Sequence, residues 1–559
     1  MQSDAIVECV PNFSEGRNKK TIDAIAAAIG ATAEVKLLDV DVGADTNRTV
    51  YTFAGRPDAV VDAAMAAARA ARELIDMRRH SGAHPRIGAL DVCPFVPVSG
   101  ISMAECVDLA NQFGKRLADE LGIPVYLYDK AARKPSRASL ADIRSGEYEG
   151  LAARLADPEW RPDFGPAKFD ERWGATVAGA REFLIAYNVN LNTRDKKLAN
   201  EIALTIREGG RLAKNPDGGT ARDAAGNPVR ISGRLKAVRA IGWYIEEYRC
   251  AQVSINVLDY TRTPLWEVFE TVEEEAAKLG LRATGSELVG LVPLAAIADC
   301  GKHYLRKAGK SSGLPSKELV GLACQSLGLD SVSPFEPEHK VIEWNMRKAG
   351  KLASMRVDDF VDEVSSDSPA PGGGSVAALA GSLGAGLASM VANLTVGKKG
   401  YEANYAALSQ MADSAQKIKE DLVLAIDKDT EAFSAVMEAG RLPKGTDEQR
   451  AFREQKVREA NENAALVPMG TAESCLLALK SCLVAVTAGN RNSVSDGAVG
   501  AIMAFAGLES AILNVRINLA GASDTGFAAE LLAKCGLLRE EAAALKAQIL
   551  EIAEKSIEK

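Results

Sequence analysis

The run RRHSGAHPRIGALDVCPFVP, residues 78–97, contains two of the chain's four histidines, His80 and His84. Pro85 disfavours a helical conformation for the residue before it, so His84 should lie on a turn just before a buried strand. Nearby cations favour the neutral imidazole, which can act as a base near pH 7, and they can also bind a carboxylate. The run predicts an acid–base histidine at a sheet edge, although a solvated turn histidine has the same pattern. The cations are Arg78, Arg79 and Arg86.

His80 and His84 also have the spacing of a metal-binding pair, but only if they lie on a helix. Gly82 and Pro85 argue against a helix there, and the nine cysteines form no CxxC pair. The sequence therefore predicts no metal site.

A second candidate lies in QKIKEDLVLAIDKDTEAFSAVMEAGRL, residues 416–442, where Asp429 completes an otherwise apolar helical face. Burial raises the pKa of a carboxyl group and makes it able to exchange a proton near neutrality. The alternative is a buried acid paired with Lys or Arg, or one that caps a helix. Asp427 and Glu431 lie beside the face and are expected in solvent. The apolar positions are Ile418, Leu422, Ile426, Phe433 and Val436.

A Gly-rich segment, SSDSPAPGGGSVAALAG, joins a turn to a helix that begins near Ser375. Consecutive glycines permit close backbone approach, and the free N–H groups of a helix start attract anions. The GxxxxGK[ST] spacing of a P-loop is absent, and a tight interhelical turn needs the same residues. In AGNRNSVSDGAVG, two polar residues either approach the same cleft or cap a helix. The predicted cleft residues are Gly372, Gly373, Gly374, Ser375, Asn490 and Asp496.

Polar residues at strand ends are weaker candidates. Asp39, Asp41 and Asp45 follow or end a predicted strand, where α/β folds collect ligands, but aspartate is also an ordinary turn residue. Asn12 and Ser14 either hold a ligand or cap the helix that starts near residue 17.

These residues need a scaffold, and the alternation of strand and helix patterns supplies one. Residues 5–98 and 182–287 each have the order βαββαβ, and RNKKTIDAIAAAI (17–29) aligns with RDKKLANEIALTI (194–206). That order is typical of the ferredoxin-like split unit. We therefore predict an α+β module of two ferredoxin-like subdomains, with an exposed hairpin or mobile loop at 211–232.

At 559 residues and 47 % hydrophobic, the chain is too long for one core. Strand patterns end after SPFEPEHKVIEW, and an Ala- and Leu-rich helical periodicity begins near residue 356. The predicted division is 1–180 and 181–335 for the two subdomains, 336–355 for a linker and 356–559 for an all-α helical-bundle domain.

Composition excludes several classes of function. A net charge of −8 without a basic block argues against nucleic-acid binding. Scattered cysteines and an N-terminal segment without secretory features lead us to expect a reducing, cytoplasmic location. Residues 372–397 contain no charged side chain and are long enough to span a membrane. Their many Gly, Ala and Ser residues favour a close-packed helix in a soluble bundle instead.

Together, VECVPNFSEGRN, DTNRTVYTFAG, GAHPRIGALDVCPFVPV, DFGPAKFDERWGAT and SPAPGGGSVAALAG resemble the bifunctional formimidoyltransferase-cyclodeaminase family along nearly the whole chain. The resemblance implies a folate enzyme of histidine degradation and one-carbon metabolism. One module would move a formimino group from N-formimino-L-glutamate to N5 of tetrahydrofolate. The other would close N10 onto the amidine carbon, release ammonia and leave 5,10-methenyltetrahydrofolate.

The resemblance also assigns roles to residues. It implies that His84 is the acid–base residue of the transferase and Asp429 that of the cyclodeaminase. It further implies tetrahydrofolate as a co-substrate that can be polyglutamylated, no metal or redox cofactor, and a homo-oligomer in which the intermediate can pass between sites. The implied folate-contacting residues are Gly165, Pro166, Ala167, Lys168, Phe169, Asp170, Glu171, Arg172, Trp173 and Gly174.

Other functions stay open at this point. The first module can instead transfer formyl groups from N-formylglutamate, and the second can be a methenyltetrahydrofolate cyclohydrolase. A non-catalytic folate-binding scaffold is a third reading, against which the presence of His84 and Asp429 argues. The sequence leaves undecided the donor, the oligomer size, channelling of the intermediate, and the role of the 211–232 loop.

Overall fold

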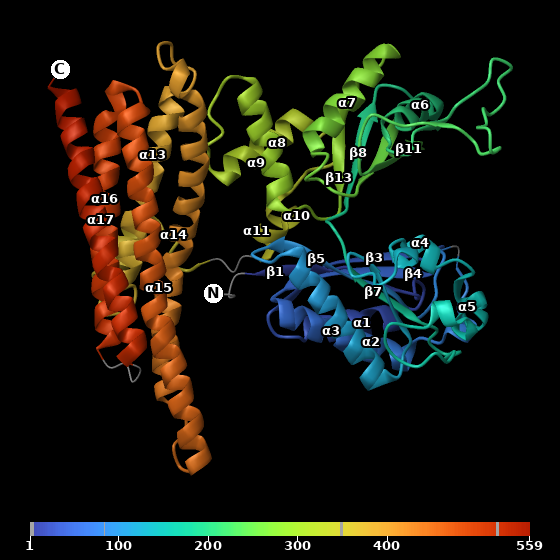
Figure 1. Cartoon of the computed structure of the whole chain (residues 1–559), viewed down its shortest axis with the longest axis horizontal. Helices are drawn as coiled ribbons and strands as arrows, with labels where there is room; N and C mark the ends of the chain where they lie inside the picture. The colour runs from blue at the N-terminus through green and yellow to red at the C-terminus, as the bar shows by residue number, and fades with distance from the viewer. Residues whose placement is uncertain (1–4, 83, 347–349, 521–524, 559) are drawn as a thin grey trace. The chain divides into compact units, whose positions relative to one another are not determined.

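The computed structural model describes residues 5–82, 84–346, 350–520 and 525–558. The chain separates into two compact units, each of which is described by itself (Figure 1). The first, residues 1–297 and 327–347, is α/β, and the second, residues 298–326 and 348–559, is helical. Residues 298–326, which the sequence placed with the second subdomain, belong to the helical unit by their contacts.

The first half of the α/β unit has a mixed seven-stranded sheet. Its first four long strands pair antiparallel in the order β3-β4-β1-β5. The short β2 pairs with β4 and β5, and β7 and β6 extend the sheet in parallel beyond β5. The strands are β1 (Ile6–Cys9), β2 (Asn12–Phe13), β3 (Val35–Gly43), β4 (Arg48–Gly55), β5 (Leu90–Ser99), β6 (Val125–Asp129) and β7 (Thr176–Ala180).

One face of this sheet packs on α1 (Lys19–Gly30), α2 (Pro57–Leu74) and α3 (Met103–Leu121) around a buried core. Side chains alternate between the two faces of β1 and β4, and Val7, Cys9, Tyr51 and Phe53 point into that core. These residues therefore define the face of the sheet that the helices cover. Arg48 therefore lies on the opposite side of β4 from the core. A smaller cluster, with Tyr126 and Val177, is covered by α4 (Leu140–Ile143) and α5 (Glu147–Ala156).

The second half repeats the pairing in a four-stranded antiparallel sheet of order β11-β12-β8-β13. Its helices α6 (Lys196–Ile206) and α7 (Leu265–Lys278) occupy the same places in the chain order as α1 and α2. Between α6 and β11 the predicted hairpin is present, with β9 (Arg211–Leu212) and β10 (Arg230–Ile231) paired in an exposed loop (Figure 1). The sheet strands are β8 (Ile185–Leu191), β11 (Val238–Ile245), β12 (Cys250–Val257) and β13 (Ala283–Val289).

The helical unit is a bundle whose core consists largely of small residues. Gly384 on α13 packs against the backbone of Gly500 on α16, and Gly381 packs against Cys475 on α15, so these helices approach closely. The hairpin of α14 and α15 extends beyond α13 and α16 (Figure 1). The bundle helices are α13 (Gly373–Thr395), α14 (Tyr405–Gly440), α15 (Asp447–Ala488), α16 (Val494–Leu519) and α17 (Thr525–Ile557).

The segment 298–326 contains most of α8 (Leu294–Lys307) and α9 (Ser316–Leu327) and is fixed to the bundle at Gly313. The Gly313 carbonyl accepts hydrogen bonds from Ser389 Oγ at 2.8 Å, Asn393 Nδ2 at 2.8 Å and Gln416 Nε2 at 3.0 Å. Three buried or half-buried donors converging on one carbonyl explain why this segment joins the helical unit.

The predicted linker is ordered at both of its ends. In the α/β unit, α10 (Pro337–Lys340) leads into α11 (Ile342–Met346), where the Asn345 carbonyl accepts from Lys36 Nζ at 2.7 Å. In the helical unit, the Leu352 and Ala353 amides donate to Asp427 at 2.8 and 3.0 Å. Asp427 was expected in solvent. That expectation is wrong because the carboxylate holds the backbone that precedes α12 (Val357–Val364).

Three helices in the described part of the chain are long and apolar enough to cross a membrane by length and composition: α13, α15 and the span Arg491–Leu519. Half or more of each apolar window is buried inside the protein. All nine cysteines are free thiols.

Candidate functional site

His84 lies in the connection between a short 3₁₀ turn, η1 (Met77–Arg79), and β5. Its Nε2 is 2.7 Å from Nη1 of Arg48, the first residue of β4. A guanidinium can only donate, so Nε2 is the acceptor and bears no proton. The structure thus fixes which ring nitrogen faces the cation.

The surroundings of His84 hold its imidazole neutral. Burial lowers its pKa to about 4, and the positive charges of Arg48 and Arg144 act in the same direction. Arg144 is itself paired with Asp91, a fully buried carboxylate that also accepts from the Ile87 amide at 2.8 Å. The cations that act on the His84 imidazole are therefore Arg48 and Arg144.

The arginines that flank His84 differ from those the sequence suggested. Arg78 pairs with Asp76 at 2.7 Å on the surface. Arg86 is buried and holds Glu149 at 2.7 Å and Glu147 at 2.9 Å. The sequence argument was wrong about these two side chains because proximity along the chain does not fix their direction, whereas β4 places Arg48 beside His84 from 36 positions away.

His80 has a structural position. Its Nε2 donates to the Asn47 carbonyl at 2.8 Å, and its Nδ1 accepts from Arg86 Nε at 3.2 Å. Burial lowers the pKa of His80, and the charge of Arg86 adds to this effect. Both ring nitrogens are therefore occupied, and the ring links the loop before β4 to Arg86.

A cavity of about 880 Å³ adjoins this region within the α/β unit. Its wall includes Pro85 and Arg144 on the side of His84, and Arg239 and Arg262 from the second half of the unit. Its volume falls in the range of small-molecule sites, and it has both acidic and basic side chains. His84 and Arg48 lie behind this wall and do not line the cavity themselves, so the cavity reaches the neighbour of His84, Pro85.

The segment Gly165–Gly174 forms a turn beside the same region and does not line that cavity. Asp170 pairs with Arg72 at 2.6 Å, and the fully buried Trp173 donates to Thr176 Oγ1 at 3.0 Å. Phe169 contacts the ring of Tyr148, with centroids 5.3 Å apart, and Tyr148 lies 5.9 Å from the Arg86 guanidinium. The exposed residues of this turn are Gly165, Pro166, Ala167, Lys168, Glu171 and Arg172.

The weaker candidates have ordinary surroundings. Asp39 and Asp41 lie on β3 and Asp45 in the turn after it, and the charge of Asp41 acts on Arg48. Ser14 Oγ donates to the Gly88 carbonyl at 2.8 Å, and Asn12 Nδ2 to the Val10 carbonyl at 3.0 Å. Neither Asn12 nor Ser14 caps the following helix. Its N-cap is Asn18.

In the helical unit, Asp429 on α14 faces the N-terminus of α13. Ser375 Oγ lies 3.4 Å from Asp429 Oδ2 and donates to the Ile426 carbonyl at 2.8 Å. Gly374 is in such close contact with Asp429 that a Cβ at this position would overlap the carboxylate. Burial raises the pKa of Asp429, while the hydrogen bonds from Ser375 oppose that shift.

Two of the predicted cleft residues lie elsewhere. Asn490 accompanies the C-terminal end of α13, where its amide donates to Thr395 Oγ1 at 2.9 Å, and Asp496 follows in the first turn of α16. A helix of 23 residues is about 34 Å long, so Asn490 and Asp496 are remote from Gly374 and Asp429 within one chain. The prediction that they approach the Gly-rich turn of the same chain is wrong.

Asn514 on α16 does approach the turn, and sequence reasoning missed it. A Cβ on Gly373 would lie 3.3 Å from Asn514 Nδ2. The amide also donates to the Ser510 carbonyl at 2.8 Å, an i−4 bond that orients the side chain along its own helix. The signal available in the sequence was an amide residue between the apolar neighbours of AILNV, residues 511–515.

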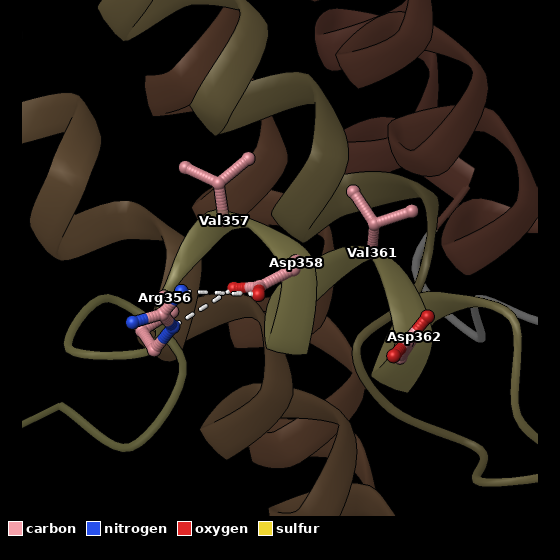
Figure 2. Close-up of a pocket in the computed structure, with 5 residues that line it drawn as sticks. All are labelled: Arg356, Val357, Asp358, Val361 and Asp362. Atoms are coloured by element: carbon pink, nitrogen blue, oxygen red, sulfur yellow. Dashed lines mark hydrogen bonds and ion pairs between the residues drawn. The ribbon is translucent and has the colours of Figure 1, made fainter.

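A shallow pocket on α12 has a different character (Figure 2). Arg356 Nε lies 3.1 Å from Asp358 Oδ1, while Val357 and Val361 project together to one side, away from this ion pair. The exposed ion pair and two valines supply no chemistry. Among the described residues, there is no cluster of three or more His, Cys, Asp or Glu side chains that could hold a metal ion.

Comparison with known proteins gives matches for both units. Residues 6–181 match the family described as "Formiminotransferase domain, N-terminal subdomain", residues 186–347 match "Formiminotransferase domain", and residues 356–536 match "Formiminotransferase-cyclodeaminase". A formimidoyltransferase-cyclodeaminase of Gallus gallus is 47 % identical over 98 % of this chain and 99 % of its own length.

Two relatives match one module each. A glutamate formimidoyltransferase of Thermoplasma acidophilum is 43 % identical over 55 % of this chain and 95 % of its own length. A methenyltetrahydrofolate cyclohydrolase of Methylorubrum extorquens is 40 % identical over 36 % of this chain and 97 % of its own length.

Proposed function

The chain belongs to the formimidoyltransferase-cyclodeaminase family, and from that premise we propose which of its residues perform each of its two reactions. The protein is a bifunctional enzyme with a transferase module and a cyclodeaminase module. The observation that carries this assignment is that relatives match both modules, together over the full length and separately.

His84 is the acid–base residue of formimino transfer. N5 of tetrahydrofolate attacks the amidine carbon of N-formimino-L-glutamate, and the tetrahedral adduct then loses glutamate. N5 must give up a proton and the departing nitrogen must gain one, so a single neutral imidazole can serve both steps in turn. The support is that His84 is neutral and adjoins a cavity of substrate size.

Asp429 is the acid–base residue of cyclisation. N10 attacks the amidine carbon on N5, loses its proton, and ammonia leaves with one, which forms 5,10-methenyltetrahydrofolate. A half-buried carboxyl group of raised pKa suits an exchange of this kind. Gly374, Ser375 and Asn514 surround the carboxylate and would position the substrate there.

Tetrahydrofolate, including its polyglutamylated forms, is the co-substrate in this account. The exposed turn Gly165–Gly174 contacts it, supported by the connection of that turn to Arg86 through Phe169 and Tyr148. No metal takes part in either reaction, because the proton transfers and an amine nucleophile already account for every bond that forms and breaks.

Cyclohydrolase activity is the second candidate for the helical module, favoured by its 40 % identity to a methenyltetrahydrofolate cyclohydrolase. Both reactions form or break a bond at the same one-carbon bridge, and they differ in whether ammonia or water is exchanged. Formyl transfer from N-formylglutamate is the corresponding alternative for the transferase.

A combined assay separates these functions. Purified protein receives N-formimino-L-glutamate and tetrahydrofolate, and glutamate, ammonia and methenyl-folate absorbance are followed together. All three products are expected. Glutamate without ammonia would restrict the activity to the first module. In parallel reactions, hydrolysis of supplied 5,10-methenyltetrahydrofolate by a protein that releases no ammonia would favour the cyclohydrolase, and turnover of supplied N-formylglutamate alone would favour formyl transfer.

The protein is proposed to be a homo-oligomer. The helices α13 and α16 pack against each other, and each exposes several large apolar side chains within the described chain. An apolar surface of this extent on a soluble protein marks an association site. These side chains are Val376, Leu383, Leu394, Val499, Ile502, Leu513 and Ile517.

The mass of the particle in solution tests this proposal. The double substitution Ile502→Glu and Leu513→Glu is expected to reduce the oligomer to smaller species, whereas exposed Leu212→Glu in the hairpin of the α/β unit is a matched control. An unchanged mass for the double variant would place the association surface elsewhere.

Three further proposals concern origin and location. The shared pairing order of the two sheets supports two ferredoxin-like subdomains that arose by duplication. Nine free thiols support a reducing, cytoplasmic location, and close packing of α13 on α15 and α16 through glycine supports a bundle that crosses no membrane.

A further inference from the structure

Arg48 differs from the other arginines near His84 in having no carboxylate partner among the described residues. Arg86 holds Glu147 and Glu149, and Arg144 holds Asp91. Arg48 is half-buried, and within the described part of the chain its side chain makes one hydrogen bond, to His84. Burial and the nearby charge of Arg144 lower the pKa of Arg48, and the charges of Asp41 and Asp91 offset only part of this effect. Removing a guanidinium from water costs free energy unless an anion pairs with it. The position of Arg48 therefore favours binding of an anion.

The guanidinium of Arg144, next to Arg48, also has an N–H donor that is not used. Arg144 directs one nitrogen to Asp91, but its Nε is buried and has no hydrogen-bond partner among the residues that the structure describes. Asp91 already accepts from the Ile87 amide as well. The two cations closest to His84 therefore offer more donors than the surrounding acceptors use.

We propose that Arg48 binds a carboxylate of the formimino donor, and that this binding releases Nε2 of His84 for proton transfer. The proposal rests on His84 being the acid–base residue of the transferase. N-formimino-L-glutamate bears two carboxylates, whose planar pair of oxygens matches the donor fork of arginine. Arg48 would thus be a substrate-binding residue that also keeps His84 inactive until the donor arrives.

The geometry explains why release is needed. While Arg48 donates to Nε2, the lone pair that would take a proton from N5 is occupied. Once a carboxylate neutralises Arg48, the cation that opposes protonation of His84 is offset, and its basicity rises. The other charged groups nearby, Asp91 with Arg144 and Arg86 with Glu147 and Glu149, already have partners and remain as they are.

Steady-state kinetics from about one pH unit below the His84 pKa of about 4 up to alkaline pH test the proposal with Arg48→Gln and Arg48→Lys. In the wild type, kcat is expected to fall on the acid side at a higher pH than kcat/KM, because the donor complex has the more basic imidazole. For Arg48→Gln, KM for the donor should rise about 10- to 100-fold, the value of a lost charged hydrogen-bond pair. Its kcat/KM should also fall on the acid side nearer pH 6.5, the ordinary pKa of histidine.

Arg48→Lys keeps the positive charge but loses the planar pair of N–H donors that a carboxylate binds. Its KM for the donor should therefore lie between those of the wild type and Arg48→Gln. Arg56→Gln is the matched control, because Arg56 pairs with Glu34 on the surface of the same sheet and should behave as the wild type. A wild-type KM for Arg48→Gln, or acid limbs of kcat and kcat/KM that superimpose in the wild-type enzyme, would overturn the proposal.

Binding of L-glutamate, the released product, separates this proposal from the assignment of His84. Calorimetry on His84→Ala should show glutamate binding retained, whereas His84→Ala with Arg48→Lys should lose it at least about 10-fold. If His84→Ala transfers formimino groups normally, the acid–base assignment fails. If His84→Ala is inactive and Arg48→Lys leaves glutamate binding unchanged, only the role of Arg48 fails. Circular dichroism of each variant excludes misfolding as the cause.

Discussion

Gly374 touches the carboxylate of Asp429 so closely that no side chain fits at position 374. The two residues belong to α13 and α14, and their contact brings the free N–H groups at the start of one helix to a half-buried acid on the other. The contact explains why position 374, directly before Ser375, is a glycine. It also gives the first prediction.

Gly374→Ala should impair ammonia release without affecting formimino transfer. The added methyl group must displace Asp429 or the start of α13, so we expect at least about a 10-fold loss of cyclodeaminase kcat, as for other small displacements of a catalytic group. Gly386→Ala is the control on the same helix, because nothing lies within 4 Å of a Cβ there. Equal ammonia release by both variants would show that the contact is unimportant for the reaction.

Asp429→Asn should remove about 100-fold or more of the ammonia release, the usual contribution of an acid–base group. It should also change stability in a pH-dependent way. Burial raises the pKa of Asp429, so its stabilising contribution is full at low pH and is lost as the pH rises through the folded-state pKa.

The Tm of Asp429→Asn relative to wild type should therefore increase from pH 4 to pH 8, because asparagine avoids the cost of a desolvated charge. Thermal unfolding of both proteins across that range measures the difference. A Tm difference that decreases with pH would mean that the carboxylate is stabilised in the fold.

Asp163→Asn should destabilise the α/β unit. Asp163 pairs with Arg137 at 2.8 Å, both side chains are buried, and Arg137 also lies over the ring of Tyr126. Loss of one partner leaves a buried charge, which costs about 3–5 kcal/mol. Asp119→Asn breaks the exposed pair with Lys115 and should cost less than about 1 kcal/mol. The temperature at which transferase activity is lost compares the two, and similar temperatures would contradict the expectation.

Asn490→Ala tests the position of a residue that the sequence placed in the cyclodeaminase cleft. The side chain is buried and donates to Ser493 Oγ at 2.9 Å, so its loss should cost about 1–3 kcal/mol of stability. The kcat of ammonia release at a permissive temperature should stay within about twofold, as for a residue remote from the reacting atoms. A large fall in kcat with an unchanged Tm would instead put Asn490 in an active site, for example that of another copy.

Local patterns predicted the elements well. The strand Arg48–Gly55 and the helix Pro57–Leu74 fall within the predicted order for residues 5–98, because alternation, Pro at the helix start and a Gly at the strand end are local signals. The repeated order βαββαβ was visible for the same reason. Element order also predicted that the helical domain begins near residue 356, close to α12.

Contacts between distant segments could not be predicted in this way. Arg48, at the start of β4, contacts His84 from 36 positions away in the sequence. Asp429 on α14 contacts Gly374 on α13. No residue spacing in the sequence indicates either contact. The same limit explains the wrong position predicted for Asn490. Its neighbours depend on which end of α13 it packs against, and the sequence does not indicate that end. It also explains residues 298–326, whose membership of the helical unit depends on the Gly313 carbonyl and its three donors.

The most direct test of two separate catalytic centres in one chain is to measure both glutamate release and ammonia release by His84→Ala. The account predicts that glutamate release from N-formimino-L-glutamate falls by about 100-fold or more. Ammonia release from supplied 5-formimidoyltetrahydrofolate should remain at the wild-type rate, because Asp429 is intact. Normal glutamate release by the folded variant would contradict the account.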